Sequence, residues 1–306
     1  MTAHFASVAL LFIIQFGLCV AVGLAVGRTT IRRLLAAIFL VAAFTLPLVV
    51  NPSPLERVAL TLLALVALIK SVLIVTANVE WLTPLRRIWQ VLVPFDVRLT
   101  HRVSPGIDGG SLARIAVSAV VIALTLWFGI TRSGHLPGRA ALATQLLCAL
   151  VFAYTIMEFA GEMIRSAHRL LGIEVAPLQR DPILSCSVAE FWGERWNVPM
   201  TRWLNEFFFR PLARTGRPVV GVVLAFVVSA ALHWWLFFAA IGWWGAWMAA
   251  LFFLVQIPAV LVERRLGIRR WPIIVRRVWT LGFMVGTSPL FILPMIRGLE
   301  MQLAGR

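Results

Sequence analysis

Long apolar runs constrain this chain more than any other feature of its sequence. The first run extends from about Phe5 to Val26. A helix rises 1.5 Å per residue, so roughly 20 apolar residues are enough to cross the roughly 30 Å hydrocarbon core of a bilayer. Similar runs follow at Ile31–Val50, Leu55–Ala77, Leu112–Ile130, Ala140–Ala160, Val219–Ala239, Trp243–Val262 and Ile273–Met295. We therefore expect an all-α integral membrane protein with about eight transmembrane helices.

The composition agrees with a single polytopic membrane domain over residues 1–306. The chain is 60% hydrophobic and only 13% charged, which leaves too few charges to cover a soluble surface of this size. Met1 to His4 carries no Lys or Arg, so we expect a retained first helix, not a cleaved signal peptide. The three cysteines lie far apart without C-x-x-C spacing, so neither a disulfide framework nor a metal site is indicated.

The distribution of the charges behind the formal net charge of +15 indicates how the chain is oriented in a membrane. Arginine-rich and arginine-poor connectors alternate along the chain, and nucleic acid is not an expected partner. The pattern predicts both termini outside and the odd-numbered loops in the cytoplasm, which places residues 161–217 on the cytoplasmic side. We expect the inner (plasma) membrane of a bacterium.

The segment between Gly161 and Arg217 is too polar to span a bilayer and too aromatic to be a solvated linker. Loops of this length are usually functional. Its aromatic residues form one stripe on a helical wheel, while charged residues of both signs repeat at i, i+4. We expect an amphipathic, re-entrant helix that lies at the interface or dips into the protein. The stripe is Trp192, Trp196, Trp203 and Phe207, and the charged series is Arg202, Glu206 and Arg210.

A break is expected inside this helix, just after Asn197. Pro199 has no backbone N–H to donate and disfavours helical angles at Val198. The amide of Asn197 then either caps exposed backbone groups or points into a cavity as an orienting group. The sequence leaves both interpretations open.

His233 is the one histidine deep inside an expected span. If that span begins near Pro218, the imidazole lies about 15–20 Å into a hydrocarbon core about 30 Å thick. Ser229, one turn earlier, is a hydrogen-bond partner if His233 only joins helices. Intramembrane ionisable residues are more often functional, and a neutral imidazole is the form that a general base needs.

The run EFWGERWN, from Glu190 to Asn197, carries a family resemblance. With Arg202-Trp203-Leu204 and Phe209-Arg210-Pro211-Leu212, it resembles the signature of the wax synthase branch of the membrane-bound O-acyltransferase family. In that family an aromatic motif ending in Trp-Asn precedes a histidine within a membrane helix, and the matching positions are Asn197 and His233. Similar motifs occur in sterol and diacylglycerol acyltransferases. The resemblance covers roughly residues 177–245, and Glu194 departs from it where the family prefers a basic residue.

The resemblance implies transfer of an acyl group from acyl-CoA, as co-substrate, to a hydroxyl acceptor. The acceptor would be a long-chain alcohol, diacylglycerol or another lipid-like alcohol, and no bound cofactor is expected. His233 would be the general base, and Asn197 would orient the thioester or stabilise the oxyanion. Substrate contacts are expected from Trp192, Trp196, Glu194, Arg195, Arg202 and Ser229.

The alternative function is a proton-coupled transporter or flippase for an amphipathic solute. His233 would then carry a proton, and Glu158 with Glu162 would complete a relay. An ion-paired cluster of the two glutamates near Arg165 is the simpler interpretation. The halves of the chain show no internal repeat, which disfavours a carrier.

Three further features have structural interpretations. Thr287-Ser288-Pro289 predicts a kink in the eighth helix, with hydroxyls bonding the freed carbonyls. The arginines between Arg264 and Arg270 favour contact with anionic lipid headgroups, with coenzyme A phosphates as the alternative. Trp243, Trp244 and Trp247 indicate an interfacial aromatic belt more than a ligand cage.

Overall fold

The computed structural model describes residues 2–50, 52–76 and 82–304, and they are almost entirely helical. Within these residues, seven helices are long and apolar enough to cross a membrane, and a bent helix pair brings the total to up to eight. These helices coincide with the eight expected runs, except that the expected end at Ala77 lies outside the described residues. The all-α membrane architecture is confirmed.

The chain forms two compact units. The first comprises Met1–Arg98, Ala231–Trp247 and Arg297–Arg306, and the second comprises Leu99–Ala230 and Met248–Ile296. Two helices, α10 (Pro218–Ile241) and α14 (Pro289–Ala304), contribute residues to both. Each unit is described by itself below.

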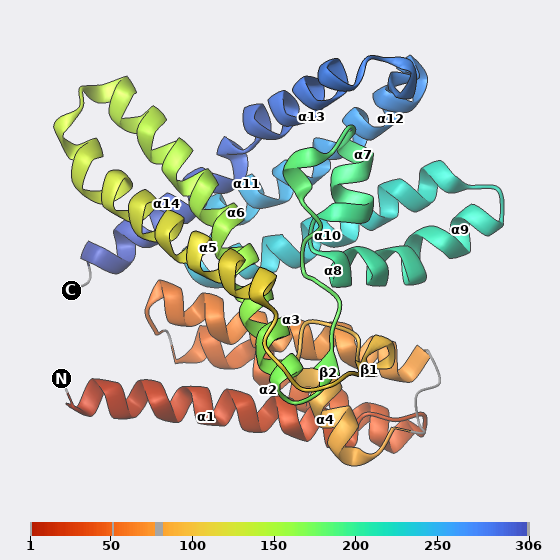
Figure 1. The fold of residues 1–306 in the computed structure, drawn as a ribbon. Coiled ribbons are helices and arrows are strands. Elements are labelled where there is room, and N and C mark those ends of the chain that lie inside the picture. The colour runs from red at the N-terminus through yellow and green to blue at the C-terminus, as the bar shows by residue number, and fades with distance from the viewer. Residues whose placement is uncertain (1, 51, 77–81, 305–306) are drawn as a thin grey trace. The chain divides into compact units, whose positions relative to one another are not determined.

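The first unit is built on three long helices that lie side by side (Figure 1). They are α1 (Thr2–Ala25), α2 (Thr30–Val49) and α3 (Pro54–Thr76), followed by the short α4 (Pro84–Leu92). The side-chain amide of Gln15, which is fully buried, donates to the carbonyl oxygens of Ala43 and Leu60 at 3.3 and 2.9 Å. A polar group within a span needs such partners, and this one joins α1 to both neighbouring helices.

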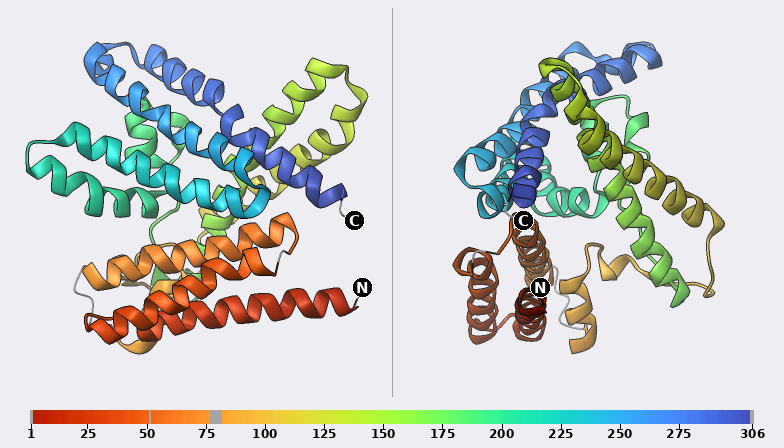
Figure 2. Two further views of the ribbon diagram at one scale, coloured as in Figure 1. Left: turned by 180° about the vertical axis from the view of Figure 1, so that it is seen from behind. Right: turned by 90° about the vertical axis from the view of Figure 1, so that its left-hand side faces the viewer.

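The second unit contains the hairpin of α5 (Gly109–Trp127) and α6 (Gly138–Leu170), whose two long helices are visible in Figure 2. A π-turn, η2 (Phe128–Arg132), and the 3-10 turn η3 (Ser133–His135) connect the two helices. The unit also holds α12 (Gln256–Leu266), η7 (Ile268–Arg270) and α13 (Ile273–Thr287), while α11 (Trp243–Leu254) begins in the first unit.

The eighth span is bent where the sequence predicts a kink. Helix α13 ends at Thr287, α14 begins at Pro289, and their axes differ by 42°. The hydroxyls of Thr287 and Ser288 donate to the carbonyls of Phe283 and Val285 at 2.9 and 2.8 Å. The predicted interruption is confirmed. Its physical reason is that Pro289 has no N–H to donate the next helical hydrogen bond.

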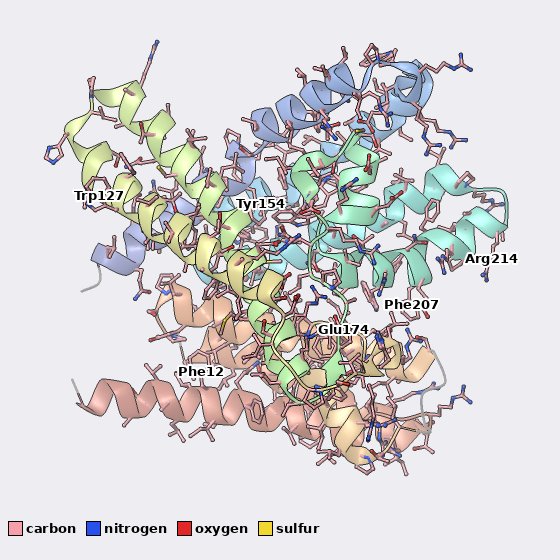
Figure 3. All side chains as sticks on the ribbon, in the orientation of Figure 1. Phe12, Trp127, Tyr154, Glu174, Phe207 and Arg214 are labelled. Carbon is pink, nitrogen blue, oxygen red and sulfur yellow. The ribbon has the colours of Figure 1, made fainter. Side chains whose placement is uncertain are left out.

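Two features outside the spans were not predicted. Strands β1 (His101–Arg102) and β2 (Ile173–Glu174) pair antiparallel, and His101 lies opposite Glu174. Helix α6 continues ten residues past the expected end at Ala160, to Leu170. Glu174 holds this extension, because its carboxylate bonds Arg165 at 2.9 Å and Arg169 at 2.6 Å (Figure 3).

Candidate functional site

The motif segment of the second unit is a chain of short helical pieces. Two π-turns divide it further than the one break that the sequence predicts after Asn197. The pieces are η4 (Pro182–Leu184), α7 (Val188–Glu190), the π-turn η5 (Phe191–Arg195), α8 (Val198–Leu204), the π-turn η6 (Asn205–Phe209) and α9 (Arg210–Arg214). Phe207 and Arg214 mark the last two pieces in Figure 3. Single π-turns are rare in proteins, and those that occur are often found at functional sites.

Asn197 occupies the break between η5 and α8. Its φ and ψ are 42° and 61°, in the left-handed region, which asparagine tolerates better than most residues. The predicted break is confirmed. The side chain of Asn197 makes no capping hydrogen bond at the start of α8, so this amide does not have the capping role that the sequence left open.

Residues 178–180 hold the Asn197 turn from the side. The backbone N–H of Val198 donates to Leu178 at 2.8 Å, and that of Arg180 donates to Arg195 at 2.9 Å. The guanidinium of Arg195 also donates to the carbonyl of Arg180 at 3.0 Å. These bonds fix the backbone on both sides of Asn197.

Glu190 and Arg195 form an ion pair across η5. The Nε of Arg195 lies 2.6 Å from Glu190 Oε1, and the backbone N–H of Cys186 donates to Glu190 Oε2 at 2.9 Å. Burial alone would raise the pKa of Glu190, but the hydrogen bonds from Cys186 and Arg195 outweigh it, so the pKa lies below its ordinary value. The carboxylate is therefore ionised at neutral pH and holds Arg195 in place.

Buried Glu263 of α12 anchors the start of α7. Its carboxylate accepts the backbone N–H groups of Val188 and Ala189 at 2.6 and 3.1 Å, and the indole N–H of Trp279 at 2.9 Å. A carboxylate is the favoured partner for the free N–H groups at a helix N-terminus. Glu263 is only 4% exposed, so these three donors also satisfy the buried oxygens of its carboxylate.

Trp192 is fixed by a second buried polar side chain. Its indole N–H donates to Gln256 Oε1 at 3.1 Å, and Gln256 Nε2 donates to the carbonyl of Phe252 at 2.9 Å. The indole ring also lies 5.3 Å from the ring of Phe253 and 6.4 Å from that of Phe226. Gln256 and Glu263 were not predicted as part of the site. Each is a polar residue within or beside an apolar run, and that position in the sequence is the signal that could have indicated it.

Helix α6 approaches the motif closely. The ring of Tyr154 lies 6.1 Å from that of Trp196 (Figure 3). About two turns later along α6, a Cβ added at Gly161 would lie 2.9 Å from Leu178 Cβ. Only glycine permits this distance, and it brings α6 against residues 178–180, which support the Asn197 turn.

The two glutamates of α6 have different partners. Glu158 pairs with Arg114 of α5 at 2.9 Å, and Arg114 lies 3.5 Å from Asp181. Glu162 lies 3.9 Å from Arg165, whose shorter contact is with Glu174. The ion-paired interpretation near Arg165 therefore holds for Glu162, whereas Glu158 binds another helix.

The remaining residues that are predicted to contact substrate differ in how far their side chains are buried. Trp196 is half-buried and stacks on Phe191 with 5.4 Å between ring centroids. Glu194 and Arg202 are exposed, and Ser229 on α10 is 6% exposed. Their contacts with substrate stay predictions.

His233 belongs to the first unit, and Asn197 belongs to the second. The imidazole is half-buried on α10. Beside it in sequence, Trp234 stacks on Phe238 at 5.0 Å, and Trp235 lies 5.7 Å from Phe44. The joint role of His233 and Asn197 stays a prediction. No group of three or more potential metal ligands occurs within the described residues.

Residues 175–255 match the family model described as the membrane bound O-acyl transferase family. These residues are similar to that family. The match includes Asn197, Glu194 and His233, and the resemblance noted in the sequence is confirmed at the level of the family. Glu263 lies just beyond the matched segment.

Several plant proteins are similar to this chain. Probable long-chain-alcohol O-fatty-acyltransferase 3 of Arabidopsis thaliana is 34% identical over 142 residues, which are 42% of each chain. Probable long-chain-alcohol O-fatty-acyltransferase 7 of the same plant is 28% identical over 169 residues, 50% of each chain. Acyl-CoA–sterol O-acyltransferase 1 is 26% identical over 207 residues, 64% of this chain and 58% of the relative. The matches span about half the length of these membrane bound O-acyl transferase relatives.

Proposed function

We propose that this membrane protein is an O-acyltransferase that moves an acyl group from acyl-CoA to the hydroxyl of a lipid-like alcohol. The observation that carries the proposal is the family match over residues 175–255, a range that contains both Asn197 and His233. Similar proteins named for long-chain alcohols and sterols favour an acceptor of that class.

His233 is the proposed general base. An alcohol is a weak nucleophile, so a neutral imidazole must take its proton as the oxygen attacks the thioester carbonyl. The C–S bond then breaks, the CoA sulfur leaves with the proton that the imidazole returns, and an ester forms. His233 lies on the apolar helix α10, where an ionisable residue is more often functional.

Asn197 is the proposed orienting residue. Its amide N–H groups are suited to bonding the thioester oxygen, on which negative charge develops in the transition state. Two observations favour this role. The side chain does not cap α8, and hydrogen bonds on both sides of the turn hold its backbone in place. A donor that is fixed before the reaction stabilises an oxyanion best.

Release of free CoA thiol tests the proposal. The purified protein is given palmitoyl-CoA with hexadecan-1-ol, a sterol or a diacylglycerol, and both thiol and ester are measured. We expect release that depends on the alcohol, and its loss in His233→Ala. The matched control is His135→Ala, an exposed histidine in η3, which should keep the parental rate.

A different result would reject the proposal. Normal ester formation by His233→Ala would remove the general base. A parent protein that releases no thiol with any of the three acceptors would remove the acyl-transfer reaction, and a carrier function would then be the better interpretation.

A further inference from the structure

Buried polar atoms without a partner lie beside the motif. Gln179 is only 4% exposed, and neither its Oε1 nor its Nε2 forms a hydrogen bond within the described residues. Glu162 is 5% exposed, and its Oε2 has no hydrogen-bond partner there either. Buried polar groups are nearly always bonded, so these three atoms need partners that the described residues do not supply.

Gln179 and Glu162 each follow one residue of a close contact between α6 and the segment before the motif. Leu178 packs against Gly161 so closely that a Cβ at Gly161 would lie 2.9 Å from Leu178 Cβ. Gln179 follows Leu178 in the chain, and Glu162 follows Gly161. The two polar residues are thus the sequence neighbours of a contact pair.

The backbone also sets Gln179 beside the Asn197 turn. Its flanking residues bond the residues on either side of Asn197, from Val198 N–H to Leu178 at 2.8 Å and from Arg180 N–H to Arg195 at 2.9 Å. Gln179 therefore lies between the two residues whose backbone bonds bracket Asn197.

The hydrogen-bonding needs of these atoms select a ligand. Gln179 Nε2 needs an acceptor, whereas Gln179 Oε1 and Glu162 Oε2 need donors. An alcohol hydroxyl can accept from Gln179 Nε2 and donate its one hydrogen to either of the two oxygens. A thioester carbonyl and a phosphate only accept, and a carboxylate at Glu162 would repel a phosphate. The arrangement therefore fits the acceptor alcohol and does not fit the reacting end of acyl-CoA.

We propose that Gln179, assisted by Glu162, binds the hydroxyl of the acceptor alcohol beside Asn197. This assignment rests on the proposed acyl transfer and names the side chains that select its second substrate. Two amides would then divide the reaction, with Asn197 at the thioester and Gln179 at the alcohol.

The kinetic test replaces Gln179 by leucine. With palmitoyl-CoA and hexadecan-1-ol, Gln179→Leu should raise the KM for the alcohol about tenfold and change the KM for palmitoyl-CoA less than about twofold. The matched control is Gln145→Leu, a glutamine of α6 whose amide already donates to Ser133 at 3.3 Å. It should leave both constants unchanged. An unchanged alcohol KM in Gln179→Leu, or a rise confined to palmitoyl-CoA, overturns the assignment.

The melting temperature gives a readout that does not need turnover. Removing an unsatisfied buried amide should leave the melting temperature of the free protein equal or higher, whereas a structural glutamine would lower it. Hexadecan-1-ol should stabilise the parent and Gln145→Leu but not Gln179→Leu. If the parent is stabilised but releases no CoA, the proposed reaction fails and the binding site stands. If Gln179→Leu is stabilised as the parent is, the site fails.

Discussion

Glu263 Oε1 lies 2.6 Å from the backbone nitrogen of Val188, which precedes it by 75 residues. The contact joins the last turn of α12 to the start of α7, where the motif segment begins. Glu263 is buried on α12 and lies outside the matched family segment. Its contact therefore links the position of the motif to the packing of α12.

Replacing Glu263 by alanine should destabilise the motif. The change leaves two backbone N–H groups and the indole of Trp279 without their acceptor, and each buried unsatisfied group costs about 1–3 kcal/mol. We expect a lower melting temperature and loss of acyl transfer. Glu263→Gln keeps one acceptor oxygen and should lose less. Arg264→Ala, an exposed neighbour, should melt with the parent, and so would Glu263→Ala if the contact were unimportant.

Acid should weaken the Glu190–Arg195 pair. The pKa of Glu190 is lower in the folded protein than its ordinary value, because hydrogen bonds from Cys186 and Arg195 outweigh its burial. Its stabilising contribution is therefore complete above the unfolded pKa near 4.5 and is lost as the pH falls through the folded pKa.

The measurement compares two melting curves across pH. Between about pH 6 and about pH 3, the melting temperature of the parent should fall further than that of Glu190→Gln, which has no carboxylate to protonate there. Equal falls in the two proteins would show that Glu190 does not contribute to the acid sensitivity.

Adding one methyl group at Gly161 should force α6 away from the motif. A Cβ there would lie 2.9 Å from Leu178 Cβ, and overpacking typically costs about 1–3 kcal/mol. Gly282→Ala in α13 is the matched control, because nothing lies within 4 Å of its added Cβ and alanine favours a helix by about 1 kcal/mol. Gly161→Ala should therefore melt lower than the parent and Gly282→Ala no lower. Equal melting of the two variants would contradict the close contact.

The spans, the kink after Thr287 and the break at Asn197 follow from local properties of the sequence. An apolar run determines its own ability to cross a bilayer, and Pro289 and Pro199 end hydrogen-bonding patterns at their own positions. Each of these predictions needs only neighbouring residues.

The partners of the site could not be predicted in the same way. Gln256 is separated from Trp192 by 64 residues, and Arg114 from Glu158 by 44. Glu162 can reach Arg165 three residues away on its own helix. Glu158 has no arginine at that spacing, and only packing against α5 decides that it binds Arg114. The π-turns at η5 and η6 likewise depend on these long-range contacts, because no residue pattern specifies them.

Asn197 combines two properties that a pair of variants can separate. Its left-handed backbone, with φ of 42°, suits glycine but costs alanine roughly 1–2 kcal/mol. Asn197→Gly should therefore keep the fold and the melting temperature, while Asn197→Ala should melt lower.

The activity of Asn197→Gly then decides what the amide does. If the amide holds the thioester, the variant should lose roughly 100-fold or more in the rate of CoA release, although its backbone is intact. Asp181→Gly is the matched control, because Asp181 has a φ of 46° on the same segment and its side chain has no proposed contact with substrate. That control should keep the parental rate. A parental rate in Asn197→Gly as well would show that Asn197 serves only to form the turn, since glycine supplies the same backbone conformation without any amide.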